Sequence, residues 1–542
     1  MRREIALILT LLVLMVSLPL PYSGLDSFKV EASNGGPVHN ITTGQNYTTI
    51  QGAINDANDG DTISVDSGIY NEDVDVNRTV SLIGEDRDTT IINASGTAPV
   101  VKVKSYDVEI FNFTIQNNNF LYSGVYIYNY RQGTNVSHNL IRNCYYGVWL
   151  WDYSEGNFIV DNEIVDCRTG VKDWYSSGNF IIGNNISLCS EYGIDVEGSD
   201  DTVVQGNTIS QCWGGIYLSY GARRTVIHDN YISNGDGGIG LDASSRNIIT
   251  NNRIEHCNLS GIYLSEFLYT GSNYNTVTNN TIAFSTQGTG LFIYGSTGNN
   301  LSDNTMLNNL YNFGVEGEDL PDFINSIDTS NTVDGKPIYF WINELDVTVP
   351  LDAGYVGLVN STRITAQTLD LTNNWQGILL AFTSDSTITG NNVTNNYNGI
   401  HVWNSSDYNT LYDNHIEQNE YGVWLGFCSN NTFYNNNFTD NSAQVYIDSP
   451  GYPNFWNETY PIGGNYWSDF KDEYPLVEDD YSGEYPQSEP DSDNIWDGPY
   501  EIDGDNIDYY PVVPEFTSLI TLPLFMVATA LAVIIYRRKH AM

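Results

Sequence analysis

The sequence predicts an all-β protein built as a single-stranded parallel β-helix, in which one chain winds through successive coils of short strands. Two observations carry this prediction. A marker pattern returns every 22–23 residues, and short stretches of alternating apolar residues lie between the markers. A repeat this short leaves no room for an amphipathic helix and cannot bury its own apolar side. Neighbouring coils must therefore stack, about 4.8 Å apart, to build a common core.

Four residue types keep their register through six consecutive repeats. The pattern is Asn-x-Ile, then in most repeats Cys three places later, then a Gly that opens the next strand. We expect Asn at the bends because it tolerates left-handed backbone and its amides can ladder between coils, and Gly to supply the turn. The register loosens near Ile282 and Met306 and returns at Val393. The Ile column comprises Ile141, Ile164, Ile186, Ile209, Ile232 and Ile254.

Five cysteines share one column of the predicted solenoid, and Cys428 lies outside it. Stacked Cβ atoms would be about 4.8 Å apart, beyond the roughly 3.5–4.5 Å that a disulfide prefers. The column therefore predicts buried free thiols that act as small apolar residues. Its members are Cys144, Cys167, Cys189, Cys212 and Cys257.

The predicted solenoid runs over residues 49–445, as one rod. At its start, the helical spacing of Ile50, Ala53, Ile54 and Ala57 predicts a short helix that caps the first coil. Residues 25–48 form a linker before it. Residues 446–513 form an acidic region rich in Tyr and Asp, which we interpret as a stalk.

The two ends predict export and a membrane anchor. Residues 1–24 read as a signal peptide, because Arg2 and Arg3 precede an apolar run. In the tail, residues 514–542, the uncharged stretch 517–536 is long enough to cross a bilayer of about 30 Å. Three basic residues follow it, so we expect a transmembrane helix with the body of the protein on the outer face of the membrane.

Composition excludes some classes of function. The formal net charge is −45, which argues against a nucleic-acid partner because phosphate binding needs clustered Lys and Arg. Aromatic residues make up 13% of the chain, more than a disordered acidic protein would carry.

Several stretches carry a family resemblance. "TIQGAINDANDGDTISV" from Thr49 looks like the start of many pectin-lyase-like proteins, and the coils resemble the PbH1 repeats of the NosD-like β-helix family. "GGNYWSDF" from Gly463 and "DNIWDGPYEIDGDNIDYYP" from Asp493 are similar to archaeal members. Pro514, Glu515 and Phe516 resemble a PEF-CTERM sorting motif, which implies an archaeosortase-like processing enzyme. The resemblance implies a right-handed solenoid.

Alternation along each strand identifies one outward face with candidate sugar-binding and catalytic residues. The aromatic candidates for sugar stacking are Trp149, Trp151, Trp174, Tyr217 and Tyr263. The charged candidates are Asp195, Glu197, Asp242 and Lys172. A lyase could use the carboxylates to hold Ca²⁺ against a uronate and Lys172 as base, and a hydrolase could use two carboxyls. The alternative is that the stacked aromatics only stabilise the sheet, and that a few acidic residues fall on this face because the chain is rich in them.

Metal sites are the remaining candidates. Clustered acidic residues near Gly498 and Gly504 predict a Ca²⁺ site at Asp491, Asp493, Asp497, Asp503 and Asp505. The resemblance implies copper, but the sequence disfavours it because the few His and Met residues do not converge.

We therefore expect an exported, membrane-associated cell-surface protein with a structural, adhesive or carbohydrate-binding role, in contact with a polysaccharide or surface-layer glycan. The alternatives are a polysaccharide lyase, epimerase or hydrolase on the same rod, and a NosD-like accessory protein for copper enzyme maturation.

Overall fold

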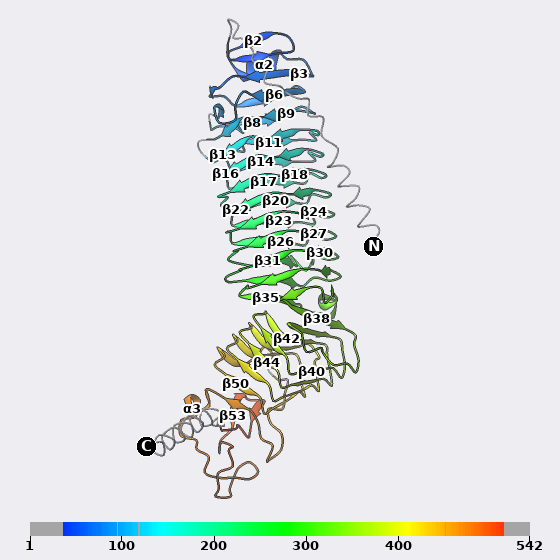
Figure 1. Ribbon diagram of the computed structural model, residues 1–542, viewed down its shortest axis with the longest axis vertical. Coiled ribbons are helices and arrows are strands. Elements are labelled where there is room, and N and C mark those ends of the chain that lie inside the picture. The colour runs from blue at the N-terminus through cyan, green and yellow to red at the C-terminus, as the bar shows by residue number, and fades with distance from the viewer. Residues whose placement is uncertain (1–35, 95, 118–119, 450, 514–542) are drawn as a thin grey trace, which may run out of the picture.

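One coil of the chain contributes a strand to each of three parallel sheets, and about 17 such turns stack into a solenoid (Figure 1). The computed structural model describes residues 36–94, 96–117, 120–449 and 451–513. The predicted signal peptide, the motif Pro514, Glu515 and Phe516, and the predicted membrane helix 517–536 lie outside these residues. Within the described ranges, no helix is long and apolar enough to cross a membrane.

The first solenoid has three sheets, which we call A, B and C. Sheet A comprises β2 (Gln45–Tyr47), β1 (Val38–Asn40), β3 (Asp61–Val65), β6 (Val80–Gly84), β9 (Glu109–Phe111), β12 (Asn135–Ser137), β15 (Phe158–Val160), β18 (Phe180–Ile182), β21 (Val203–Gln205), β24 (Val226–His228), β27 (Ile248–Thr250), β30 (Thr276–Thr278), β33 (Asn300–Ser302) and β36 (Ser326–Ile327). Sheet B comprises β4 (Gly68–Tyr70), β7 (Thr90–Asn93), β10 (Thr114–Gln116), β13 (Leu140–Arg142), β16 (Glu163–Val165), β19 (Asn185–Ser187), β22 (Thr208–Ser210), β25 (Tyr231–Ser233), β28 (Arg253–Glu255), β31 (Thr281–Ala283), β34 (Thr305–Leu307) and β37 (Thr332–Val333).

Sheet C carries the longest strands of the repeating coils and faces the viewer in Figure 1. It comprises β5 (Val74–Val76), β8 (Val101–Val103), β11 (Val125–Tyr128), β14 (Tyr146–Trp151), β17 (Thr169–Trp174), β20 (Tyr192–Glu197), β23 (Gly214–Ser219), β26 (Gly237–Asp242), β29 (Ile262–Ser265), β32 (Thr289–Tyr294) and β35 (Tyr311–Glu316).

The predicted repeat register is confirmed. Ile141 pairs with Ile164, and Ile164 with Ile186, in neighbouring strands of sheet B, and all three are buried. The Asn column is a hydrogen-bonded ladder: the Nδ2 of Asn184 donates to the Oδ1 of Asn207 at 3.0 Å, and the backbone N–H of Asn184 donates to the same oxygen at 2.9 Å. The core is thus a stack of like residues on like, with buried amides satisfied between coils.

The amide ladder confirms one expected reason for Asn, but the expected left-handed backbone of Asn and the expected turn role of Gly are wrong. The residue with left-handed φ is the one before each ladder Asn, such as His138 at 58° and Asp161 at 52°, so Asn is selected for its side-chain bonds. The strand Gly is required by close approach and not by a turn. A Cβ on Gly170 would lie 2.5 Å from the backbone oxygen of Gly193 and 2.5 Å from Cγ2 of Ile186.

All six cysteines are free and buried, as predicted. The sulfurs of the column point toward backbone carbonyls, with Cys144 Sγ 3.1 Å from the oxygen of Arg142. In the second solenoid the corresponding corner is filled by an Asn ladder, in which Asn396 donates to Asn419. Either Cys or Asn can therefore fill this corner of a coil.

The chain does not form one straight rod, because a second solenoid begins at β38 (Lys336–Ile342) and meets the first at an elbow (Figure 1). β38 pairs antiparallel with β37, which ends the first register. We call its leading sheet sheet D, comprising β38, β39 (Tyr355–Val359), β42 (Gln376–Ala381), β45 (Asn398–Trp403), β48 (Tyr421–Gly426) and β51 (Ala443–Ile447). The other two sheets comprise β40 (Thr365–Gln367), β43 (Thr387–Thr389), β46 (Thr410–Tyr412) and β49 (Thr432–Tyr434), and β41 (Asp370–Thr372), β44 (Asn392–Thr394), β47 (His415–Glu417), β50 (Asn437–Thr439) and β52 (Tyr466–Trp467).

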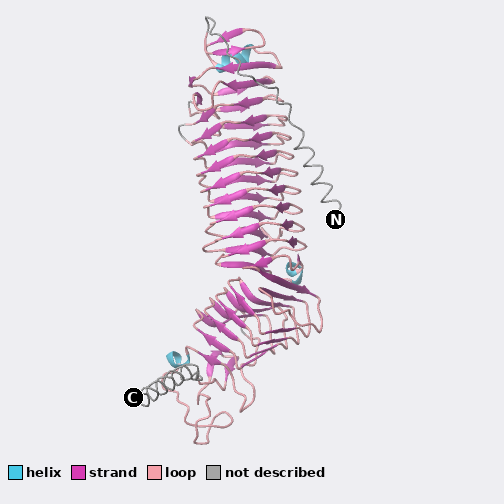
Figure 2. Cartoon of the chain, viewed as in Figure 1, coloured by secondary structure: helices cyan, strands magenta, loops and turns pink. Residues whose placement is uncertain are grey.

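Helices are few and short, as the cartoon shows (Figure 2). α2 (Ile50–Asp56) lies at the first coils, where a helix was predicted. The hydroxyl of Thr49 accepts from the N–H of Gly52, and the carboxylate of Glu72 accepts from the N–H groups of Ile50 and Gln51. A 3₁₀ helix, η1 (Leu320–Phe323), precedes the elbow.

The acidic C-terminal region packs onto the last coil of the second solenoid, so the prediction of a stalk is wrong. It contains α3 (Phe470–Glu473) and the hairpin β53 (Tyr500–Asp503) and β54 (Asn506–Asp508). Trp467 stacks on Phe438 at 4.4 Å, and the carboxylate of Asp508 accepts from the backbone N–H of Asn465. A separate ladder through Asn414, Asn436 and Asn465 therefore ends on Asp508, which closes its hydrogen bonds.

Candidate functional site

The predicted site residues lie on the outward face of sheet C. Register pairs place Trp149, Lys172, Asp195, Tyr217, Gly240 and Tyr263 in one column, one residue from each coil. A second column holds Trp151, Trp174 and Glu197, and Asp242 pairs with Ser265 farther along. The face divides into an aromatic cluster, a charged centre and a groove.

The aromatic cluster lies toward the N-terminal coils. Trp151 stacks on Trp174 with centroids 5.6 Å apart and planes within 6°, and Tyr126 stacks on Trp149 at 4.6 Å. Lys102 Nζ lies 4.4 Å from the ring centroid of Tyr128. The rings cover one another and stay half-buried, so their contacts stabilise the sheet surface as well as presenting apolar area.

The charged centre is a three-residue ion cluster. Lys172 Nζ donates to Asp195 Oδ2 at 2.6 Å and to Glu197 Oε2 at 2.5 Å, and the side chains of Lys172 and Asp195 are each only 10% exposed. Burial raises the pKa of Asp195 to about 6 against the opposing charge of Lys172. Burial acts to lower the pKa of Lys172, but its pairing with Asp195 and Glu197 outweighs this and raises it.

This geometry removes Lys172 as the base of a lyase, because its ammonium is held charged between two carboxylates. It also removes the expected Ca²⁺ position on this face, since the ammonium already lies between Asp195 and Glu197. Asp242 is engaged separately by the hydroxyls of Tyr217 and Ser265. Oδ1 of Asp195 keeps no hydrogen-bond partner among the described residues.

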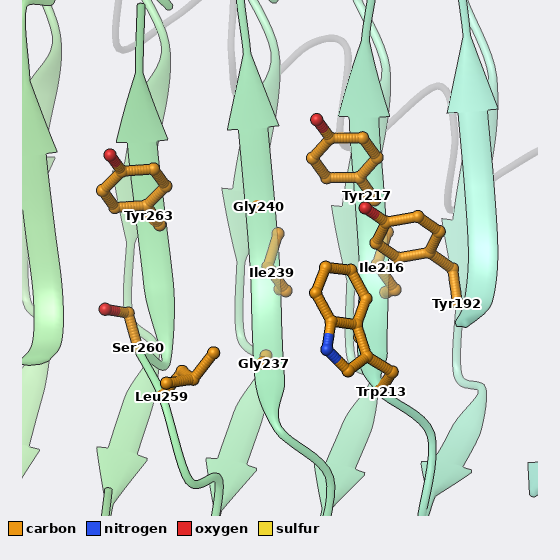
Figure 3. Close-up of a pocket in the computed structure, with 12 residues that line it drawn as sticks. Tyr192, Trp213, Ile216, Tyr217, Gly237, Ile239, Gly240, Leu259, Ser260 and Tyr263 are labelled. Carbon is orange, nitrogen blue, oxygen red and sulfur yellow. The ribbon is translucent and has the colours of Figure 1, made fainter. Parts of the chain in front are cut away.

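A groove of about 330 Å³ lies next to the charged centre, over β20, β23, β26 and β29 (Figure 3). Tyr192, Trp213 and Tyr217 line one side and Tyr263 the other. Gly240 interrupts the aromatic column, so Tyr217 and Tyr263 are two strand spacings, about 10 Å, apart. Glycines form much of its floor, so the groove exists because side chains are missing there.

Sequence reasoning found Tyr217 and Tyr263 but missed Tyr192, Trp213 and the glycine floor. The available signal was the run Gly235-Asp-Gly-Gly-Ile-Gly240, which puts Gly where neighbouring coils carry aromatics. Tyr192 immediately precedes the glycine that opens the strand. The alternation of outward and inward residues was counted only from that glycine onward, so it did not cover Tyr192. Ring contacts now assign it, since Tyr192 stacks on Tyr217 at 4.6 Å and within 4°.

The acidic residues proposed for Ca²⁺ are not brought together. The carboxylate of Asp497 accepts from the backbone N–H groups of Asp480 and Tyr481, Asp493 from Ile495, and Asp503 from Asp505. Asp491 is exposed. Across the described ranges, no group of three or more His, Cys, Asp or Glu is placed to hold a metal ion. The acidic side chains terminate backbone turns instead.

A comparison with models of protein families shows which family this chain belongs to. The model of the family described as "Periplasmic copper-binding protein (NosD)" matches residues 159–337 and 352–472, together more than half of the chain. The chain belongs to the NosD family. The match begins within the first solenoid and continues into the second, across the elbow.

The residues of this NosD-family chain do not fit a copper site, which would need several converging His, Cys or Met side chains. His228 bonds to its neighbour Asp229, and His401 is buried without a second donor residue beside it. The column thiols are at most 4% exposed. Within the part of the chain that is described, the soft donors are therefore either dispersed or enclosed.

Solved structures with a similar fold are distant. The A-module of the mannuronan C-5 epimerase AlgE6 of Azotobacter vinelandii is 14% identical, with 75% of this chain and 92% of that chain covered and a TM-score of 0.35. An alginate lyase of Paenibacillus sp. is 16% identical, with 46% and 92% covered and a TM-score of 0.34. DFA-IIIase of Arthrobacter chlorophenolicus is 13% identical, with 52% and 79% covered and a TM-score of 0.35. A comparison with curated proteins gives no match.

Proposed function

We propose that this NosD-family protein is an exported, cell-surface protein that binds a neutral polysaccharide on the outward face of sheet C. The groove between Tyr217 and Tyr263 is the observation that carries the proposal. Its walls are aromatic, its floor is glycine, and it is open at the surface of a rigid sheet. Sugar rings present apolar C–H faces that pack on aromatic rings, and such sites are mostly apolar with a few placed polar groups.

Charge favours a neutral over an acidic glycan. The carboxylates of Asp195, Glu197 and Asp242 flank the groove, and the one nearby cation of this stretch of sheet C, Lys172, is already paired with two of them. A uronate would bring further negative charge to a chain with a net charge of −45. Such like-charge contacts weaken binding and slow association.

Export and surface attachment belong to the proposal. The family description places its members in the periplasm, and the N-terminal signal and C-terminal apolar stretch read from the sequence agree with export and anchoring. A membrane anchor would hold the solenoid at the cell surface, with an archaeosortase-like enzyme as the processing partner of the motif at Pro514, Glu515 and Phe516.

Affinity electrophoresis of the full chain tests the binding proposal, with glucomannan, xylan and amylose as neutral probes and alginate and polygalacturonate as acidic probes. We expect retardation by at least one neutral probe and none by the acidic ones. Gly240→Tyr extends the aromatic column through the groove and should abolish the retardation. Thr208→Tyr adds the same side chain at an exposed position of sheet B, one coil before Gly240, and serves as the matched control.

Absence of retardation by all neutral probes, or equal retardation of Gly240→Tyr and wild type, would contradict the proposal. A thermal melt of each variant establishes that it is folded.

A calcium ion in the C-terminal region is tested separately. An unchanged melting temperature between millimolar Ca²⁺ and chelator would exclude a structural calcium ion there.

A second candidate function is hydrolysis of the bound glycan, favoured by the environment of Asp195. A carboxyl with a pKa of about 6 can donate a proton near neutral pH, and Asp195 lies in register beside Tyr217 of the groove. A reducing-sugar assay on the retained neutral polysaccharide tests it. Release of reducing ends by wild type and not by Asp195→Asn would support catalysis, and no release would leave binding as the function.

A further inference from the structure

The aromatic surface of the groove continues past the end of the first solenoid. Tyr263, a wall of the groove, stacks on Phe292 of the next coil with centroids 5.8 Å apart and planes within 2°. Phe292 contacts Trp375 edge-on at 5.1 Å. Trp375 immediately precedes β42, a strand of the second solenoid that Figure 1 labels, so the contact between Phe292 and Trp375 crosses the elbow.

The elbow is held by specific hydrogen bonds between β35 and sheet D. The backbone N–H of Trp375 donates to the oxygen of Phe313 at 2.9 Å, and Nε2 of Gln376 donates to the oxygen of Val315 at 3.0 Å. Nε1 of Trp403 donates to the oxygen of Gly317 at 3.0 Å. One backbone hydrogen bond and two side-chain hydrogen bonds fix the angle between the two solenoids, so their surfaces have a defined relation.

The ring contacts then continue along sheet D. Trp375 stacks on Tyr397 at 4.0 Å, and Tyr397 contacts Tyr421 at 5.5 Å. Trp424 contacts Tyr421 at 5.0 Å and Tyr446 at 4.6 Å. We call Tyr397, Tyr421, Trp424 and Tyr446 the sheet D patch. These rings are partly exposed, with Tyr446 39% exposed, and they form a contiguous patch of apolar surface.

An unpaired polar side chain lies within this patch. His401 is in register with Trp424, its ring 5.7 Å from that of Trp424 and 5.3 Å from that of Trp403. It is 5% exposed, and neither ring nitrogen has a hydrogen-bond partner among the described residues. Burial lowers its pKa to about 3, which keeps the imidazole neutral. Buried polar groups are almost always paired with a protein group or with ordered water, so the two unpaired nitrogens are an unusual feature of this patch.

We propose that the sheet D patch is a second subsite for the same neutral polysaccharide, and that the ligand is a chain long enough to lie over both solenoids. The inference rests on the proposed function of the groove. Continuity of ring contacts from Tyr263 to Tyr446 is the argument for a common ligand. Both ring nitrogens of His401 are enclosed beside Trp403 and Trp424, so a sugar hydroxyl would reach them only by displacing one of these rings. The carboxylate of Glu316, which accepts from Nε1 of Trp375 at the elbow, adds negative charge to the path and again disfavours a uronate.

Length dependence of binding separates the two subsites. The probes are the disaccharide and octasaccharide fragments of whichever neutral polysaccharide is retained best, titrated calorimetrically into the full chain. We expect the octasaccharide to bind at least tenfold more tightly than the disaccharide. Tyr421→Ala combined with Trp424→Ala should weaken the octasaccharide by roughly tenfold and leave the disaccharide unchanged.

Tyr412→Ala is the matched control, because Tyr412 stacks on Tyr434 on a different outward face of the second solenoid. It should change neither affinity. Equal affinities of the two fragments, or an octasaccharide affinity unmoved by the double variant, would overturn the second subsite while the groove stands. Loss of both fragments in Gly240→Tyr identifies the groove as the primary site, and failure of all neutral probes to bind wild type overturns both proposals.

Discussion

Nε1 of Trp375 donates a hydrogen bond of 2.5 Å to the carboxylate of Glu316, and this bond joins the second solenoid to the last sheet C strand of the first. Burial raises the pKa of Glu316, and the indole donor opposes that rise. The pair is therefore a buried contact on which the elbow depends.

Trp375→Ala should loosen the elbow. The substitution removes that hydrogen bond together with ring contacts to Phe292 and Tyr397. Because Trp375 is only half-buried, we expect a cost of about 2–3 kcal/mol, at or below the range for a fully buried aromatic. We expect earlier unfolding of the second solenoid in denaturant and a changed maximum dimension in small-angle X-ray scattering. Tyr408→Ala, at an exposed bend of the second solenoid, is the control and should change neither.

Asn207→Ala should destabilise the first solenoid strongly. The amide of Asn207 donates to Ile181 O and Asn230 Oδ1 and accepts from the backbone N–H of Asn184, so its loss leaves buried groups unpaired in three coils. At about 1–3 kcal/mol for each orphaned group, a loss of several kcal/mol is expected in urea unfolding. Asn185→Ala, at an exposed position of β19, should change stability by less than about 0.5 kcal/mol. Equal effects of the two variants would contradict the ladder.

Stability should fall as pH rises from about 4 to about 7. Burial raises the pKa of Asp173 and of Asp508 to about 7 in the folded state, against an ordinary value of 3.8. The folded protein therefore holds more protons than the unfolded chain in this window, and the free energy of unfolding decreases with pH, on the order of a few kcal/mol for each group. Melting temperatures at pH 4.5 and 7.5 should differ less in the double variant Asp173→Asn and Asp508→Asn than in wild type. An equal difference in both proteins would assign the pH dependence to other groups.

The column thiols should be unreactive until the solenoid unfolds. Burial raises the pKa of Cys257 in the column, and of Cys428 outside it, to about 12. The hydrogen bond with Cys189 lowers the pKa of Cys212, but all six cysteines are at most 4% exposed, so a reagent cannot reach them in the folded protein. Titration with a thiol reagent should detect no fast-reacting cysteine in the native protein and six after unfolding without reductant. Fewer than six in the unfolded state would show a disulfide, and a fast native reaction would show that the column opens.

The repeating part of the fold was predictable because each coil places the same residue types at the same positions. The Ile column, the amide ladder and the free thiols all followed from the 22–23 residue register. The ladder role of Asn was predicted, but the expected left-handed backbone of Asn and the expected turn role of Gly were wrong. Left-handed backbone and turn propensity are local properties, whereas a bond from Asn184 to Asn207, or the approach of Gly193 to Gly170, exists only between stacked coils.

The candidate site was predictable as a face but not as a groove. Alternation along the strands placed Trp149, Asp195 and Tyr217 outward in one column. It could not show that Lys172 is neutralised by two carboxylates, because side chains two positions apart on a neighbouring strand meet only in the folded sheet. The packed C-terminal region escaped prediction for a related reason, since Asp508 is buried by coils more than 40 residues away in sequence.

The sequence by itself determined the solenoid, its register, its acidic charge and its NosD-type coils, because these depend on short-range periodicity and composition. Tertiary structure alone decided where the solenoid breaks, how Trp375 joins its two parts, and which missing side chains open a groove beside Tyr217. These features depend on contacts between non-adjacent coils and on empty space. Neither of these produces a periodic pattern in the sequence.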